Sequence, residues 1–282
     1  MSHETFDARH CELGEGPFWH PERQQYFWFD ILGRRLLSRD GDAALEWSFP
    51  EHASAAGWID RDTLLLATET GLRRFDIASG AHEPIIALEA ERTGTRSNDG
   101  RADPMGGFWI GTMGKAADHR QGAIYRFHRG AVERVVPEVT IPNSICFSPD
   151  GRSAYYADTR RQRIWTQPLD AEGWPDGPAE VFVDLRGEGL NPDGSVVDAE
   201  GGLWNAQWGA GRVARYLPDG SFDRAIAVGG RHASCPAFGG PDLDQMIVTT
   251  AREGIESPDG HQGRVYRVDP GVRGQAEHRV VA

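Results

Sequence analysis

Hydrophobic and polar residues alternate along this chain in short runs, and each run ends in a tight turn rich in Pro, Asp and Gly. Alternation with a period of two residues, bounded by such turns, is typical of β-strands. No segment keeps hydrophobic residues at helical spacing over three turns, so no long helix is predicted. A strand is expected directly after each of six turns, over residues 25–30, 63–68, 107–112, 153–158, 202–207 and 245–250.

The turns recur at intervals of roughly 40 to 50 residues, which is the repeat length of four-stranded propeller blades. We therefore expect an all-β fold, a six-bladed β-propeller with a central channel, formed by residues 1–282 as a single domain. Closing the ring requires a strand from one terminus to complete a blade begun at the other, and segments 5–10 and 278–281 are the candidates. A large sandwich or a barrel without repeats is the alternative, but it leaves the common register of the turns unexplained.

One position, five residues before each turn, is distinguished by its chemistry. The first strand of a propeller blade lines the channel, so these six residues should surround one mouth of it. We call them the ring positions, and they are Glu15, Ala55, Asn98, Asn143, Asp193 and Cys235. Each one alone fits ordinary turn or strand-end chemistry. Together, four oxygen donors in one register predict a site for a divalent cation such as calcium, magnesium, manganese or zinc.

The net charge and the cysteines limit which binding partners and which cellular compartment are expected. The net charge of −12 disfavours binding to nucleic acids or anionic membranes. No run of 18 apolar residues and no apolar secretory signal is present, so neither a membrane span nor export is expected. Three widely spaced cysteines do not suggest a disulfide framework, which favours a cytoplasmic location. Cys235 is interpreted as a packing residue, because nothing adjacent to it would activate a thiol.

Six segments resemble the SMP-30/gluconolactonase/LRE family of sugar lactonases, and they follow one another in the family's order. They are residues 14–19, 96–100, 111–113, 141–151, 192–195 and 235–240. The resemblance implies a six-bladed propeller with one divalent cation at the channel mouth. Motifs of other catalytic classes, such as the nucleophile elbow, the HExxH zinc motif and the phosphate-binding loop, do not occur in the sequence.

Carried over residue by residue, the resemblance implies that Glu15, Asn143 and Asp193 bind the metal, with zinc, calcium, manganese or iron(II) as candidates. It also implies that Asp193 is the catalytic residue and that Arg96 and Asn98 contact the sugar lactone. Several relatives carry an acidic sugar contact after the segment equivalent to 111–113. Lys115 stands nearby here, either as a substrate contact or as a solvated loop lysine, so the sugar itself is not assigned.

The function predicted from these observations is a metal-dependent lactonase that opens a sugar-acid (aldono) lactone to the free aldonic acid. The cation polarises the carbonyl and activates water, and Asp193 takes the proton. Ala55 and Cys235 lack oxygen donors and are expected to leave the gap through which the lactone approaches. Two alternatives stand beside this prediction: a calcium-binding or interaction propeller without catalysis, and an esterase or organophosphate hydrolase on the same fold.

Overall fold

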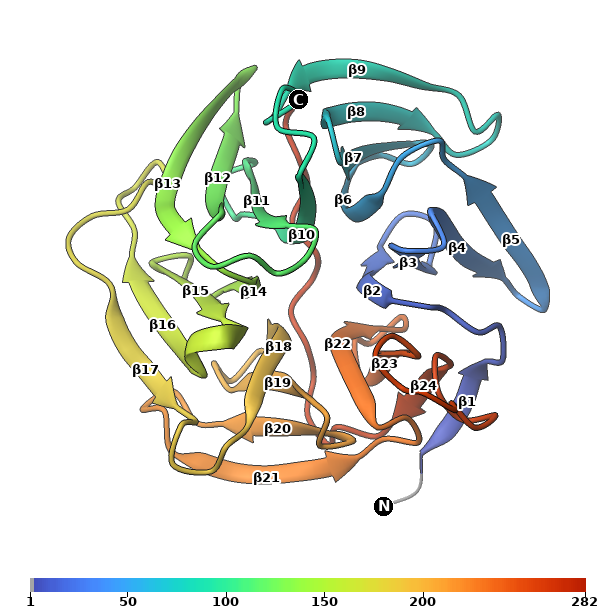
Figure 1. The fold of residues 1–282 in the computed structure, drawn as a ribbon, viewed down its shortest axis with the longest axis vertical. Coiled ribbons are helices and arrows are strands. Elements are labelled where there is room, and N and C mark those ends of the chain that lie inside the picture. The colour runs from blue at the N-terminus through green and yellow to red at the C-terminus, as the bar shows by residue number, and fades with distance from the viewer. Residues whose placement is uncertain (1–2) are drawn as a thin grey trace.

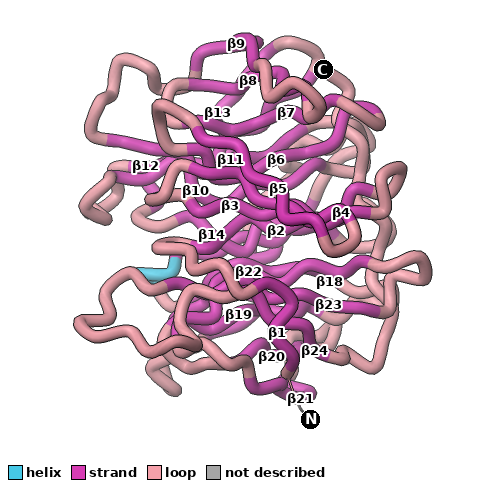
Figure 2. The backbone as a smooth tube through the Cα atoms, turned by 90° about the vertical axis from the view of Figure 1, so that its right-hand side faces the viewer, coloured by secondary structure: helices cyan, strands magenta, loops and turns pink. Residues whose placement is uncertain are grey.

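Six four-stranded antiparallel sheets surround a common axis in the computed structural model, which describes residues 3–282 (Figure 1). Each sheet is one blade, and the blades follow one another around the axis in chain order. The prediction of an all-β, six-bladed propeller is therefore confirmed. Within the described residues the only helix is a single 3₁₀ turn, η1 (Thr159–Arg161), which lies on the rim of blade 4 (Figure 2).

Blades 1 to 5 each consist of four consecutive strands, counted outward from the channel. Blade 1 contains β2 (Gly14–His20), β3 (Gln25–Asp30), β4 (Arg35–Asp40) and β5 (Ala43–Ser48). Blade 2 contains β6 (Ala53–Asp60), β7 (Thr63–Thr68), β8 (Gly71–Asp76) and β9 (His82–Ala87). Blade 3 contains β10 (Thr95–Ala102), β11 (Phe108–Gly114), β12 (Gly122–His128) and β13 (Ala131–Val139).

The remaining blades are built in the same way, except that the last one draws a strand from the start of the chain. Blade 4 contains β14 (Pro142–Phe147), β15 (Ser153–Asp158), β16 (Arg163–Pro168) and β17 (Glu180–Asp184). Blade 5 contains β18 (Asn191–Val197), β19 (Leu203–Trp208), β20 (Arg212–Tyr216) and β21 (Phe222–Ala227). Blade 6 contains β22 (His232–Gly239), β23 (Gln245–Ala251), β24 (Val265–Val268) and β1 (Glu4–Asp7).

The six strands expected after the turns are the second strands of the six blades. Three of them, β3, β7 and β15, begin and end at the predicted residues. The other three differ from the prediction by one or two residues at their ends. Buried aromatic and aliphatic side chains pack in clusters within and between neighbouring blades, which holds each sheet against the next.

The ring is closed by the N-terminal strand alone. In blade 6, β1 pairs with β24, with Glu4 opposite Arg267 and Thr5 opposite Tyr266. The prediction for segment 5–10 is thus confirmed in type, although the strand spans Glu4–Asp7. All three cysteines are buried and none forms a disulfide. No helix in residues 3–282 combines the length and the apolar character needed to cross a membrane.

The prediction that segment 278–281 completes a blade is wrong. Residues 269–282, which we call the C-terminal tail, cross the ring instead, as the red trace in Figure 1 shows. The backbone of the tail is hydrogen-bonded to blades 5, 6, 2 and 3 in turn. Near its end, Val280 N donates to Trp58 O at 2.9 Å, and its side chain is fully buried in the apolar cluster between blades 2 and 3. Burial of this valine favours the crossing path over a strand pairing.

Blades 3 and 5 each contain a buried ion pair at the turn between the first and second strands. Asp103 and Asp198 each accept hydrogen bonds from backbone N–H groups of their own turn. Each also binds an arginine of the third strand at 2.7 Å, Arg126 for Asp103 and Arg215 for Asp198. These turns lie at the end of the channel that the tail crosses.

Candidate functional site

All six ring positions lie on the first strands of the blades, and all six are buried. These strands contact one another around the axis. Beside each ring position the pairing of the first with the second strand is shifted by a bulge or irregularity. Bulges bend a strand and re-aim its side chains, and they are frequent next to active sites. The repeated irregularity gives the six ring positions an equivalent local geometry near one mouth of the channel.

Two glycines beside the ring positions permit the close approach of neighbouring strands. Gly16, which follows Glu15, has a positive φ of 53°, and a Cβ there would lie 2.3 Å from Ser54 O. A Cβ on Gly194, which follows Asp193, would lie 2.3 Å from Cys235 Sγ. A larger residue at either place would push the adjacent first strands apart. The glycines therefore belong to the construction of the channel mouth.

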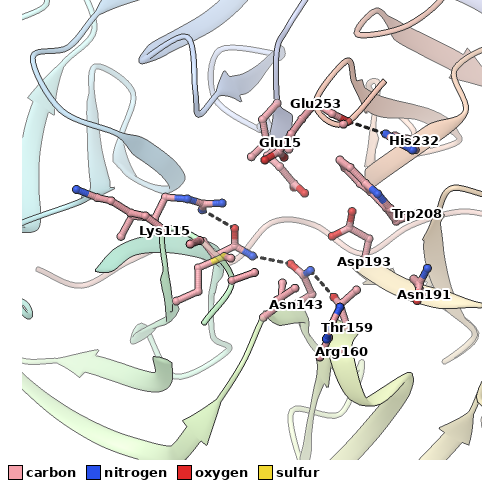
Figure 3. Close-up of a pocket in the computed structure, with 18 of the residues that line it drawn as sticks. Glu15, Lys115, Asn143, Thr159, Arg160, Asn191, Asp193, Trp208, His232 and Glu253 are labelled. Atoms are coloured by element: carbon pink, nitrogen blue, oxygen red, sulfur yellow. Dashed lines mark hydrogen bonds between the residues drawn. The ribbon is translucent and has the colours of Figure 1, made fainter. Parts of the chain in front are cut away.

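A cavity of about 840 Å³ opens at this mouth (Figure 3). Its wall contains every residue for which a metal-binding or substrate-binding role was predicted from the sequence. They are Glu15, Arg96, Asn98, Lys115, Asn143 and Asp193. Its size lies within the range that small-molecule sites occupy. Residues from four different blades thus meet around one space, as the common register of the turns indicated.

Ala55 and Cys235 do not form an entrance to this cavity, so that prediction is wrong. Both side chains are completely or almost completely buried, and neither lines the cavity. Ala55 packs in the apolar cluster between blades 2 and 3, and Cys235 is pressed against Gly194. Burial also raises the pKa of the Cys235 thiol well above its ordinary value, which agrees with a packing role. Their small side chains fill the channel wall beneath the site.

A chain of hydrogen bonds fixes the amide groups of the site. Arg96 Nη1 donates to Asn98 Oδ1 at 2.7 Å, and Asn98 Nδ2 donates to Asn143 Oδ1 at 2.9 Å. Asn143 Nδ2 in turn donates to Thr159 Oγ1 at 2.8 Å. These bonds orient the Asn143 amide so that its oxygen stays among the acidic side chains with a second lone pair free (Figure 3).

Glu15 and Asp193 are two buried carboxylates without a positively charged partner. Gly16 N donates to Glu15 Oε2 at 3.0 Å, but neither carboxylate forms an ion pair within residues 3–282. Burial raises the pKa of Glu15, and the nearby Asp99 raises it further. Burial likewise raises the pKa of Asp193, with Glu15 as the next largest cause. Holding two carboxylates together out of water is unfavourable unless a cation or protons compensate their charge.

The donor set of Glu15, Asp193 and the Asn143 amide oxygen fits a divalent cation. Such an ion would supply the positive charge that the two carboxylates lack, and oxygen ligands suit hard cations. The described residues contain no cluster of three or more His, Cys, Asp or Glu side chains suited to a metal. The proposed metal site therefore depends on two carboxylates and one amide oxygen.

Asp99 is a third buried acid, placed below the cavity. Its carboxylate accepts a hydrogen bond from Ile145 N at 2.7 Å, which ties blade 3 to blade 4. Burial raises its pKa to about 6. Asp99 does not line the cavity, so its charge acts on Glu15 and Asp193 through the channel rather than on a bound molecule.

Arg96 is the only buried cation in the cavity wall among the described residues. Burial lowers its pKa, while the negative charges of Glu253, Glu15 and Asp193 oppose that change. Its Nη1 is used by Asn98 and by the carbonyl of Ser97. No hydrogen bond from its Nε or Nη2 occurs within residues 3–282, so donors remain for a bound molecule.

Lys115 lines the cavity, but its ammonium group already has partners. It forms an ion pair with Glu69 and donates to Thr93 O at 2.9 Å. Its side chain is about one-third exposed, at 36%. The structure thus places Lys115 at the rim of the cavity, where Glu69 holds its charge.

Several residues of the cavity wall were missed by reasoning from the ring positions. The most relevant are Thr159, Arg160, Trp208, His232 and Glu253. Four of them lie at or just beyond the end of the second strand of a blade, the exception being His232. Because the second strand runs antiparallel to the first, its end returns to the mouth where the first strand begins. Counting forward along the second strands would have revealed these positions.

Comparison with known proteins gives consistent results over nearly the whole chain. Residues 13–252 match the family model described as the SMP-30/Gluconolactonase/LRE-like region. The chain is 37% identical to an L-arabinolactonase of Azospirillum brasilense, over 95% of this chain and 91% of that protein. It is 35% identical to a 6-deoxy-6-sulfogluconolactonase of Pseudomonas putida, over 86% and 84% respectively.

A solved structure is also very similar. It is described as a calcium-binding protein, regucalcin, from Agrobacterium tumefaciens, and it superposes with a TM-score of 0.96 at 39% identity. The match covers 100% of this chain and 98% of that one. The agreement extends over all six blades and includes the strands that carry the ring positions.

Proposed function

This chain belongs to the SMP-30/gluconolactonase/LRE-like family, and on that premise we propose that it is a metal-dependent lactonase acting on a sugar-acid lactone. The observation that carries the proposal is the pair of buried, unpaired carboxylates of Glu15 and Asp193 beside the oriented amide of Asn143. Two similar proteins are named as lactonases of sugar acids, which supports this substrate class.

Glu15, Asn143 and Asp193 would hold one divalent cation at the channel mouth. When bound, such an ion supplies Lewis acidity, which polarises a carbonyl group and lowers the pKa of water. Calcium, zinc, manganese and iron(II) are the candidates, and the similarity to a protein described as calcium-binding supports a divalent ion.

Asp193 is proposed as the general base. It takes a proton from the water whose oxygen bonds to the lactone carbonyl carbon. As the ring C–O bond breaks, the same proton goes to the departing ring oxygen, which leaves as a hydroxyl group. The product is the open-chain acid. Asp193 forms no ion pair with a basic side chain within residues 3–282, so no such side chain competes for this task.

Arg96 and Asn98 position the substrate in this proposal. Arg96 lines the cavity, and its Nε and Nη2 make no hydrogen bond within residues 3–282, so these donors are available to bind lactone oxygens. Asn98 links Arg96 to Asn143 through its amide, so the group that binds substrate and the metal ligand are held in one rigid arrangement.

The experiment uses purified protein treated with a chelator and then supplied with calcium, zinc or manganese. Proton release from pentono- and hexonolactones is followed with a pH indicator, and paraoxon is tested in parallel. We expect lactone turnover to disappear on chelation and to return with at least one cation. Lactone turnover that resists rigorous chelation would refute the metal dependence. Faster paraoxon turnover would identify an esterase, and cation binding without any turnover would identify a binding propeller.

A further inference from the structure

Glu253 is an acidic side chain in the cavity wall that has no assigned partner. It follows β23 of blade 6 and is partly buried. Its backbone is fixed, since Glu253 N donates to Glu12 O at 2.9 Å and Glu253 O lies 3.0 Å from His232 Nδ1. In contrast, its carboxylate makes no hydrogen bond or ion pair within residues 3–282. A rigid backbone with a free carboxylate is an arrangement suited to a ligand.

Arg96 and Glu253 line the same cavity from opposite sides of the ring, since blades 3 and 6 are separated by two blades in either direction. The two charges attract each other: burial raises the pKa of Glu253, and Arg96 counteracts that rise. Nevertheless, they form no ion pair in the described residues. A donor and an acceptor that face each other across a gap can both be satisfied by a polar molecule lying between them.

An aromatic wall stands beside Glu253. Trp208, at the end of β19, lines the cavity and stacks on His232 with ring centroids 4.2 Å apart and an interplanar angle of 19°. Figure 3 shows Trp208 between His232 and Asp193, with Glu15 and Glu253 next along the same wall. A flat apolar surface next to a few oriented polar groups can contact the C–H face of a ring while its hydroxyls are hydrogen-bonded.

We propose that Glu253 is a specificity-determining residue that accepts a hydrogen bond from a hydroxyl group of the lactone, opposite the donors of Arg96. The proposal rests on the lactonase function proposed above. An ionised carboxylate only accepts hydrogen bonds, so Glu253 favours hydroxylated rings and disfavours an anionic substituent at the same place. The unsubstituted ring of a simple lactone offers it nothing to bind.

The test compares Glu253→Ala and Glu253→Gln with wild type on three kinds of lactone. These are a fully hydroxylated hexonolactone, its single deoxy derivatives, and δ-valerolactone, which has no hydroxyl group. For the hydroxylated lactone, kcat/KM should fall by about tenfold to a hundredfold in Glu253→Ala, mainly through KM. Turnover of δ-valerolactone should be unchanged. One deoxy lactone should be insensitive to the substitution, and it identifies the hydroxyl that Glu253 binds.

Glu12→Gln is the matched control, because Glu12 is an exposed acid close to Glu253 that does not line the cavity. The glutamine variant of Glu253 keeps an acceptor oxygen and should lose less affinity than the alanine variant. It also serves as the test if the alanine variant fails to fold. An equal fall of kcat/KM for δ-valerolactone and the hydroxylated lactone would overturn the proposal, because it would show a general effect on the site.

Binding of a cyclic polyol that lacks the lactone carbonyl separates this proposal from the proposed function. Calorimetry with wild type and Glu253→Ala should show a Kd raised by about tenfold or more in the variant. If wild type hydrolyses no lactone, the lactonase proposal fails while this measurement still decides the role of Glu253. An unchanged Kd would overturn the proposal whatever the catalytic result.

Discussion

The two mouths of the central channel treat buried charge in opposite ways. At the open mouth, the carboxylates of Glu15 and Asp193 are buried without an ion-pair partner among the described residues. At the mouth that the C-terminal tail crosses, Arg101 of blade 3 forms an ion pair with Glu277 of the tail, and both side chains are about nine-tenths buried. The turns on that side add the buried pair of Asp103 and Arg126.

We interpret the difference as a division between buried charges that are paired within the fold and buried charges that are left for a cation or a substrate. A buried ion that is paired and hydrogen-bonded costs the fold little, whereas an unpaired one is expensive to keep. Burial alone therefore does not identify a functional acid in this protein. Glu15 and Asp193 are distinguished by burial without an ion pair together with a place in the cavity wall.

The largest expected effect is the loss of catalysis in Asp193→Asn. Removal of the proposed base should lower kcat for a sugar-acid lactone by about 10²- to 10⁴-fold. The melting temperature of the metal-free variant should not fall, because one of two neighbouring like charges is removed. Steady-state kinetics and thermal unfolding in chelator measure both. A variant that retains full activity would end the comparison, since the unpaired charge would then have no catalytic role.

The opposite pattern is expected for Arg126→Met at the closed mouth. Without its guanidinium, Asp103 is buried with no cation, which should lower the free energy of unfolding by about 3–5 kcal/mol. At temperatures where the variant is folded, kcat should match wild type. Urea unfolding measures the change. Arg120→Met is the control, because Arg120 and Glu138 form an exposed pair whose loss should cost less than about 1 kcal/mol. An equal fall in the free energy of unfolding in Arg126→Met and Arg120→Met would contradict the stabilising role of the buried ion pair.

Asp99 lies between the two mouths, and its titration should make the free energy of unfolding depend on pH. Burial raises its pKa from 3.8 to about 6. The protonated form of Asp99 is therefore favoured in the folded state. The stability that this form contributes is fully present below pH 3.8 and is lost as the pH rises through about 6. In chelator, Asp99→Asn should unfold at pH 8 with a free energy about 1–3 kcal/mol higher than wild type. Urea titrations at pH 5 and pH 8 check this, and a steeper pH dependence in the variant would refute it.

The smallest effect is expected for Lys115→Met at the rim of the open mouth. Glu69 already holds the ammonium group, which is partly exposed, so KM should change by less than about fivefold, the equivalent of 1 kcal/mol. Glu69→Gln provides the matched variant for the same ion pair. A larger rise of KM in Lys115→Met alone would support the substrate contact predicted from the sequence.

The ring positions could be predicted because turn chemistry and period-two strands are local signals. A turn fixes where a strand starts, and alternation then fixes which side chains face the channel, so Glu15, Asn143 and Asp193 were placed together without any structure. Ala55 and Cys235 were misread because a small residue at the same register can fill a wall as well as leave a gap. Only packing distinguishes the two.

The path of the tail and the far wall of the cavity were not predicted, because they depend on contacts between segments that are far apart in the sequence. Residues 269–282 form no strand, and the tail is held by hydrogen bonds to several blades and by the burial of Val280. Nothing local in the sequence encodes such a path. Glu253 and Trp208 were within reach of the same register argument, but only if it is applied to the second strands as well as the first.

The pairing of β1 with β24 has a consequence for how the protein is made. Glu4 is translated before blade 1, whereas its partner Arg267 is translated only after five blades and most of the sixth. Until then the nascent chain carries one unpaired strand at the start and an incomplete blade at the end, both with open edges. Glu15 and Asp193, on blades 1 and 5, are brought into register around the channel only when this ring shuts. Enzyme activity should therefore appear on a ribosome-bound chain only after β24 has left the exit tunnel.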